Sequence, residues 1–173
     1  MIDWLLASDL RSNLQDIFVI SLIALALLKG RGPERATIAV WVLCFEIPNL
    51  VYREILGHDI RLTGVDSFLV MKDVAACVLW VLLALYANRN YPLWIAGVQL
   101  LAVGAHVARG LLEAIAPISY AFLIVAPGWI ALVIMAIGFT RHAMRERKYG
   151  AYRDWRTSPV PGGPPSLLHS NLN

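Results

Sequence analysis

Long apolar runs alternate with short polar segments along this chain, and the alternation predicts membrane-spanning helices. Each of five runs is near the ~20 residues that cross ~30 Å of hydrocarbon at 1.5 Å per residue. Lipid offers the backbone no hydrogen-bond partner, and the runs are too long and too apolar for barrel strands. The sequence therefore predicts an all-α integral membrane bundle of five transmembrane helices, at about residues 10–28, 36–56, 65–87, 92–116 and 118–140.

The positions of lysine and arginine predict which ends of these helices face the cytoplasm. Ten basic residues follow the first, third and fifth runs: Lys29, Arg31, Arg35, Arg89, Arg141, Arg145, Arg147, Lys148, Arg153 and Arg156. The segments on the other side carry few basic residues, beside several carboxylates. Because basic residues are retained on the cytoplasmic side, we expect the N-terminus outside and the C-terminus in the cytoplasm. From the helical build we also expect a bacterial inner (cytoplasmic) membrane.

Composition divides the chain into three parts. Residues 1–140 form the five-span transmembrane domain, and residues 141–157 form a basic juxtamembrane segment. Residues 158–173 are rich in Pro, Gly and Ser, and such segments bury too little apolar surface to fold, so we expect a disordered tail. Cys44 and Cys77 fall inside apolar runs and are predicted to be buried small hydrophobic residues.

The basic segment is predicted to anchor the chain to the bilayer by its anionic headgroups. Basic residues near such a surface contribute roughly 1 kcal/mol each. Tyr149, Tyr152 and Trp155 are interleaved with the charges, which is typical of an interfacial helix. The alternative is a surface that docks a membrane protein partner. The sequence pI of about 9.1 does not indicate nucleic-acid binding, since no recognisable module accompanies the charge. The predicted headgroup anchors are Arg141, Arg145, Arg147, Lys148, Arg153 and Arg156.

The fourth run carries ionisable residues at membrane depth. His106, Arg109 and Glu113 are spaced i, i+3 and i+7, which places them on one helix face, and Gln99 extends that face. A charged side chain at the bilayer centre costs at least ~2.5–3.5 kcal/mol, so such residues face the bundle interior and find partners.

The second and third runs carry matching residues in the same predicted outer half of the membrane. Three acids are balanced by three bases, so we expect interhelical ion pairs. Arg109 is predicted to pair with Glu46 or Asp73, and Glu113 with Lys72 or Arg53. The candidate ligand or ion pocket consists of Glu46, Asn49, Arg53, Lys72, Asp73, Gln99, His106, Arg109 and Glu113.

Three functions remain open for this pocket. The first is binding or conduction of a small polar or ionic species from the outside. The second is a non-catalytic accessory or assembly subunit, in which the ion pairs only hold the bundle and a membrane protein or second copy of the chain is the partner. The third is a membrane enzyme that uses Glu46, Asp73 or His106 as acid or base.

Motifs of enzymes and cofactor sites do not occur in the sequence. It contains no GxSxG, Walker or HExxH pattern, and no second histidine at the depth of His106 that would complete a haem site. We therefore predict no catalytic residue, metal or cofactor, and expect the chain not to be an enzyme. Pro48 and Pro127 lie inside predicted helices, where proline removes a hydrogen bond and kinks the helix, either for packing or as a hinge.

Overall fold

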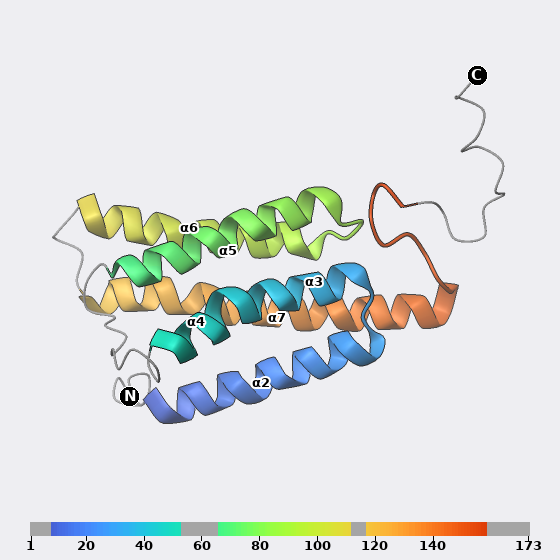
Figure 1. Cartoon of the computed structure of the whole chain (residues 1–173), viewed down its shortest axis with the longest axis horizontal. Helices are drawn as coiled ribbons and strands as arrows, with labels where there is room; N and C mark the ends of the chain where they lie inside the picture. The colour runs from blue at the N-terminus through green and yellow to red at the C-terminus, as the bar shows by residue number, and fades with distance from the viewer. Residues whose placement is uncertain (1–7, 53–65, 112–116, 159–173) are drawn as a thin grey trace, which may run out of the picture.

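In the computed structural model, the described residues form five helical segments that lie side by side and run alternately up and down (Figure 1). The structure describes residues 8–52, 66–111 and 117–158. The first segment is α2, and the second is made of α3, the π-helical turn η1 and α4. The helices are α2 (Ser8–Lys29), α3 (Gly32–Trp41), η1 (Val42–Glu46), α4 (Ile47–Leu50), α5 (Ser67–Tyr86), α6 (Tyr91–Leu111) and α7 (Pro117–Tyr149).

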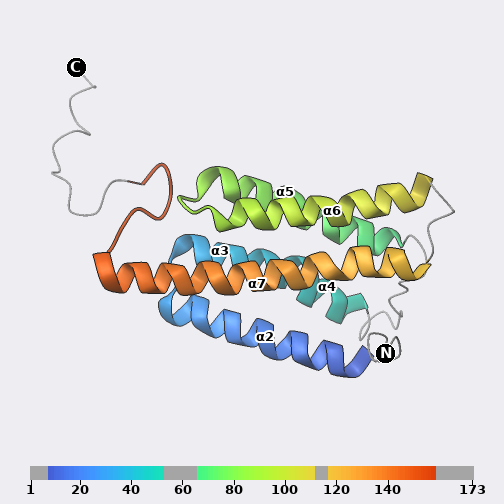
Figure 2. The ribbon, with the colours of Figure 1, turned by 180° about the vertical axis from the view of Figure 1, so that it is seen from behind.

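The long helix α7 and the segment α3–α4 lie between α2 on one side and the pair α5–α6 on the other. The view from behind shows the same order (Figure 2). α7 packs most extensively against α6 and also contacts α2 and α3. The start of α2 and the end of α7 lie at opposite ends of the bundle (Figure 1).

Among the described residues, three helices are long and apolar enough to cross a membrane. They are α5, α6 and the part of α7 from Ser119 to Tyr149. Many of their large apolar side chains are exposed on the outside of the bundle, Leu101 and Phe122 among them. Such a surface is unusual for a water-soluble protein and suits lipid. The prediction of a helical membrane protein agrees with this finding.

Aromatic rings fill the middle of the bundle. Trp41 lies against Phe45 with ring centroids 4.9 Å apart, and against Trp80 with centroids 6.2 Å apart. Buried Leu132 and Met135 of α7 belong to the same apolar cluster. These residues come between the polar ends of their helices, so an apolar layer separates the two polar regions described below.

Pro48 shapes the second segment. Proline lacks an N–H, and its ring collides with the carbonyl four residues earlier, here that of Cys44. The turn before it is π-helical, and the N–H of Ile47 donates to the carbonyl of Val42, five residues back. A π-turn is a usual way to fit such a break, so the kink expected at Pro48 takes this form. Pro127, in contrast, lies inside the continuous helix α7.

Candidate functional site

A histidine joins three helices near the end of the bundle where α5 begins and α6 ends. We define the His106 cluster as Asp73, Gln99, His106 and Tyr120. The Nε2 of His106 lies 2.8 Å from an oxygen of Asp73, and its Nδ1 lies 2.7 Å from the Tyr120 hydroxyl. The side-chain amide of Gln99 donates to the other Asp73 oxygen at 3.0 Å. All four residues are buried.

The arrangement of donors and acceptors in the His106 cluster can accommodate one extra proton. An ionised Asp73 only accepts, so the Nε2 of His106 carries a hydrogen and donates to it. In the neutral imidazole, Nδ1 accepts from the Tyr120 hydroxyl. In the imidazolium, Nδ1 donates to the Tyr120 oxygen instead. Both protonation states therefore keep both hydrogen bonds, after rotation of a single hydroxyl.

Helix geometry explains why these residues meet. Gln99 and His106 are seven residues apart on α6 and lie on one face. Because α5 and α6 are antiparallel neighbours, the first half of α5, with Asp73, packs against the second half of α6. Tyr120 comes from the first turn of α7, which begins at the same end. Three of the nine predicted pocket residues thus form one contact group, together with a tyrosine that the sequence did not single out.

Other predicted pocket residues have partners outside the His106 cluster. The Lys72 ammonium donates to the side-chain oxygen of Asn49 at 3.0 Å and lies 5.2 Å from the centre of the Phe45 ring. The indole N–H of Trp41 donates to Glu46 at 2.7 Å. The structure therefore joins Lys72 with Asn49, as the common depth of these residues suggested, and gives Glu46 a neutral partner.

The ion pair predicted for Arg109, with Glu46 or Asp73, stays a prediction. Asp73 is taken up by His106 and Gln99, and Glu46 by Trp41, whereas the Arg109 guanidinium lies 6.0 Å from the centre of the Tyr120 ring. The spacing along α6 identified the correct face of the helix, but not which neighbouring residue each side chain meets. The two remaining predicted residues, Arg53 and Glu113, lie outside the described residues, as does the pairing expected for Glu113.

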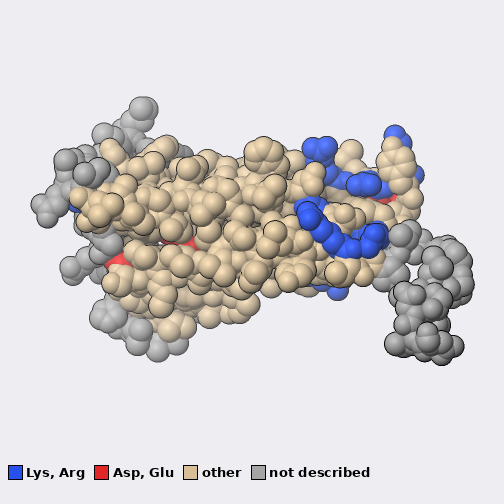
Figure 3. Space-filling view, turned by 90° about the horizontal axis from the view of Figure 1, so that it is seen from above, with Lys and Arg blue, Asp and Glu red and all other residues tan. Residues whose placement is uncertain are grey.

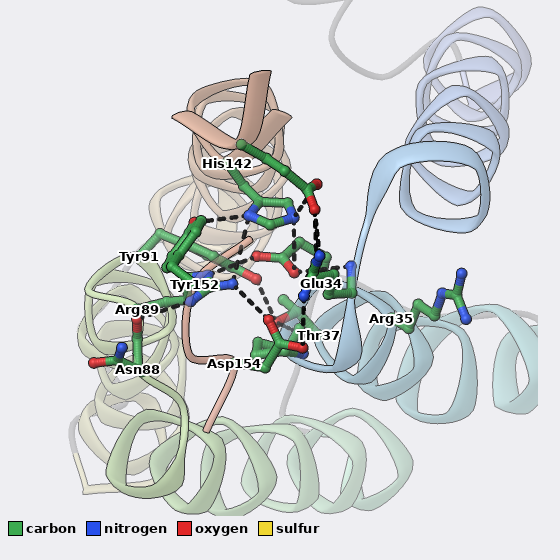
Figure 4. Close-up of polar contacts among 12 residues, drawn as sticks. Glu34, Arg35, Thr37, Asn88, Arg89, Tyr91, His142, Tyr152 and Asp154 are labelled. Carbon is green, nitrogen blue, oxygen red and sulfur yellow. Dashed lines mark hydrogen bonds and ion pairs between the residues drawn. The ribbon is translucent and has the colours of Figure 1, made fainter. Parts of the chain in front are cut away.

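A second histidine cluster lies at the opposite end of the bundle (Figure 4). We define the His142 cluster as Glu34, Arg89, His142, Tyr152 and Asp154. The Arg89 Nε donates to Glu34 at 3.1 Å, and an Nη donates to Asp154 at 3.1 Å. The His142 Nδ1 lies 2.7 Å from the Tyr152 hydroxyl, and its buried Nε2 lies 3.7 Å from a Glu34 oxygen. Glu34 is 0% exposed, so this is a deeply buried ion pair.

Further contacts close the His142 cluster. Arg31 forms an ion pair with Glu146 at 2.6 Å, and Glu146 also lies 3.6 Å from the His142 Nε2. The Arg89 guanidinium lies 4.2 Å from the centre of the Tyr152 ring. On the apolar side, the Thr37 hydroxyl donates to the carbonyl of Pro33. The cluster thus combines ion pairs, ring contacts and a buried imidazole.

The start of α3 explains how Glu34 is held. Glu34 is the third residue of the helix after the cap residue Arg31, and it accepts the Arg31 backbone N–H at 3.1 Å, as in a capping box. A carboxylate in the first turn is also stabilised by the partial positive charge of the helix N-terminus. These local contacts position the carboxylate that Arg89 reaches from the connection between α5 and α6.

The chain after α7 folds back onto this end of the bundle. Gly150 has φ of +77°, a left-handed conformation that ends α7. Trp155 then forms an isolated β-bridge with Ala87, and its ring packs against Gly32, where no side chain would fit. The N–H of Asn88 donates to the carbonyl of Asp154 at 3.0 Å.

This return corrects the expectation of an interfacial helix through Tyr152 and Trp155. α7 continues past residue 140 to Tyr149, but the chain beyond Gly150 is not helical and packs on protein. The side chains of Arg153 and Arg156, two predicted headgroup anchors, donate to the carbonyls of Arg156 and Ala87. The other four predicted anchors, Arg141, Arg145, Arg147 and Lys148, are exposed on α7. The predicted tail begins at Ser158, and 159–173 lie outside the described residues.

Electrostatics assign protonation states at this end. Burial raises the pKa of Tyr152 above its ordinary value, although the Arg89 guanidinium opposes the shift. The hydrogen bond to Glu146 raises the pKa of Arg31 above its ordinary value. At neutral pH, Tyr152 is therefore an uncharged phenol that can donate to His142, and Arg31 is a cation.

The sequence did not predict the His142 cluster, because its charged residues were interpreted as belonging to loops between the spans. Glu34, Arg89 and Asp154 all come from segments next to predicted spans, where most charged residues face water. One signal was present: Glu34 sits three residues after Arg31 and directly after Pro33, a pattern typical of a helix start. That pattern places the carboxylate but does not reveal its burial.

Comparison with known proteins adds no family. The chain matches no protein-family model, no curated protein and no solved structure. Within the described residues, no group of three or more His, Cys, Asp or Glu side chains is placed to hold a metal ion. The contacts that the two clusters contain are hydrogen bonds and ion pairs.

Proposed function

We propose that this chain is a five-span integral membrane protein that binds and exchanges a proton at the His106 cluster. The proposed topology places the start of α2 outside and the end of α7 in the cytoplasm of a bacterial-type inner membrane. Proton binding is a specific case of the sequence-based prediction that the pocket binds or conducts a small polar or ionic species. The observation that carries it is the hydrogen bonding of His106 on both ring nitrogens, to a carboxylate and to a phenol.

The five-span topology is supported by the dimensions and surface of the first two segments. α2 has 22 residues, a length of about 33 Å at 1.5 Å per residue. Its Ile17, Ile20 and Leu27 side chains are each at least 60% exposed, as in a lipid-facing helix. α2 and the segment α3–α4 lie lengthwise in the bundle with the three apolar helices (Figure 1). The basic residues of the loops support the orientation.

Proton binding is supported by the burial and closure of the cluster. His106 and Gln99 are 3% and 2% exposed, which leaves no room for a larger ligand between them and Asp73 at hydrogen-bond distance. Histidine is the side chain whose ordinary titration falls nearest neutral pH, and such residues inside membranes are typical of proton relays. Arg109, beside Tyr120, lies on the side toward the predicted outer face.

The second candidate is a non-catalytic accessory subunit in which the cluster only fixes helix register. It is favoured by one observation: each polar atom of the His106 ring has a partner within the protein. Buried polar contacts can specify a structure without any ligand. A membrane enzyme is the third candidate, and no contact among the described residues favours it over the first two.

Histidine ¹⁵N NMR of the purified protein in detergent separates the first two candidates. The chain has only 4 histidines, so the His106 signals are assigned by their loss in His106→Gln. We expect His106 to interconvert between neutral and protonated forms with pH while the protein stays folded. Tyr120→Phe should move the Nδ1 signal, since it removes the hydroxyl at 2.7 Å. The exposed Tyr86→Phe is the matched control and should leave it unchanged.

A single protonation state of His106 throughout the pH range of the folded protein would contradict proton exchange and leave the structural role. Thermal melting of each variant shows whether the fold is retained. Glutamine at position 106 keeps hydrogen-bonding capacity without titrating, so its fold should survive.

A further inference from the structure

A groove lies between the start of α6 and the end of α7, at the end of the bundle opposite to the His106 cluster. Its volume is about 930 Å³. The walls combine two kinds of surface. The apolar part includes Trp94, Ile134 and Ile137, and the basic part includes Arg141, Arg145 and Lys148.

One face of α7 changes from apolar to cationic along the groove. Ile134, Ile137, Arg141, Arg145 and Lys148 are spaced by three or four residues and therefore share one side of the helix. The first two belong to the apolar stretch of α7, and the other three follow it. The change occurs within about one turn, or roughly 5.4 Å along the axis.

Three cations of the groove form no ion pair with a described carboxylate, unlike Arg89, which also lines it. Among the described residues at this end, the ion pairs of lysine and arginine are formed by Arg31 and Arg89. Arg141, Arg145 and Lys148 are exposed, and no described carboxylate lies within ion-pair distance of them. Figure 3 shows lysine and arginine gathered at this end of the molecule, while most of the face drawn carries neither charge.

The opposite wall suits the boundary between hydrocarbon and headgroups. Trp94 lies in the first turn of α6 and is 67% exposed. Tryptophan is enriched at this level of a membrane because its ring is apolar and its N–H is polar. Tyr149, also exposed, lies beside the Lys148 ammonium. The groove therefore has an apolar half that suits hydrocarbon and a cationic half that suits headgroups.

We propose that this groove binds an anionic membrane phospholipid, with its phosphate against Arg141, Arg145 and Lys148 and an acyl chain along Ile134 and Ile137. The charge of the cationic half is complementary to a phosphate, and arginine binds phosphate oxygens in a two-pronged manner. The apolar half requires an amphiphile, which a water-soluble phosphate is not. This site is distinct from a general attraction of the basic end to a charged surface, and it is independent of the proton site.

Lipid-specific quenching of tryptophan fluorescence tests the groove. The purified protein is reconstituted in phosphatidylcholine vesicles that contain either brominated phosphatidylglycerol or brominated phosphatidylcholine. The protein has 6 tryptophans, so the signal of Trp94 is obtained as the difference from Trp94→Phe. We expect the anionic lipid to quench Trp94 preferentially. Its preference over phosphatidylcholine should fall roughly fivefold for each groove cation removed, and about a hundredfold in Arg141→Gln/Arg145→Gln/Lys148→Gln.

The matched control removes the same charge from the same end, but outside the groove. Lys29→Gln/Arg35→Gln/Arg147→Gln changes three exposed basic residues that do not line it. This variant should keep the lipid preference of the original protein. Equal losses in the two triple variants would overturn the proposal in favour of a general headgroup anchor. Equal quenching by both brominated lipids in the original protein would overturn it as well.

A soluble competitor distinguishes the source of the phosphate. Glycerol 3-phosphate carries the charge of the headgroup without the acyl chains and should not relieve the quenching of Trp94. If it abolishes the preference completely, the groove binds a water-soluble phosphate and the lipid proposal is wrong. Circular dichroism of each variant confirms that helix content is unchanged, which is expected because every substituted cation is exposed.

Discussion

At the scale of single residues, the two histidine clusters stabilise buried polar groups in different ways. Around His106, one carboxylate is held by an imidazole and an amide. Around His142, a guanidinium joins two carboxylates and also donates to main-chain carbonyls. Removing the Arg89 charge from the second arrangement leaves the fully buried Glu34 carboxylate without its cation. The effect of removing this charge on the free energy of unfolding can be measured.

Arg89→Leu should lower the free energy of unfolding by about 3–5 kcal/mol, since a buried carboxylate left without its cation is strongly destabilising. The carboxylate is that of Glu34, which is 0% exposed. Adding Glu34→Leu should recover part of the loss, because the double variant contains no stranded charge there. The measurement is a double-mutant cycle by thermal melting in detergent.

Arg35→Leu is the control for that cycle. Arg35 is an exposed arginine of α3, the helix that also carries Glu34. Substitutions of exposed residues usually change the free energy of unfolding by no more than about 0.5 kcal/mol. Strictly additive losses for Glu34→Leu and Arg89→Leu would mean that the two side chains do not stabilise each other.

At the scale of helices, close packing of α6 on α7 depends on one glycine. A Cβ at Gly138 would lie 2.5 Å from the Tyr91 ring. Tyr91 in turn contacts Phe139 edge-on, with centroids 5.8 Å apart, and its hydroxyl lies 3.2 Å from that of Thr37. The ring thus links α6, α7 and α3, and its position requires a backbone without a side chain at 138.

Gly138→Ala should destabilise the protein by about 1–3 kcal/mol, because overpacking forces neighbouring side chains and backbone to shift. Gly97→Ala in α6 is the matched control, since a Cβ there meets nothing within 4 Å. It should be neutral or stabilising by up to about 1 kcal/mol, the helix preference of alanine over glycine. Thermal melting of both variants checks the expectation, and equal effects would contradict the contact with Tyr91.

At the scale of the whole molecule, the proposed topology follows from an odd number of passes and a charged end. A reporter fused after Asn173 should be active only in the cytoplasm, and one fused before Met1 only outside. The measurement uses two reporters, one that is active only in the cytoplasm and one that is active only outside. Activity of both fusions on the same side would contradict the five-span topology, although the helix packing would remain.

The sequence by itself determined the helical class, and one face of α6. Apolar runs of this length predict membrane helices because the backbone must satisfy its own hydrogen bonds in lipid. Three helices of the structure have the required length and composition. The seven-residue spacing of Gln99 and His106 predicted a shared polar face, and both contact Asp73 across helices as the common depth suggested. These features depend on local periodicity, which a sequence displays directly.

Only the tertiary structure decided the partners. Glu34 and Arg89 are 55 residues apart, and Arg89 and Asp154 are 65 apart, so no local pattern links them. Likewise, the specific contact of Asp73 with His106 was not predicted, because periodicity gives the face of a helix but not the rotation and height of its neighbour. The return of Trp155 to Ala87 is a main-chain pairing, whose geometry depends on where Gly150 ends α7 relative to the connection between α5 and α6.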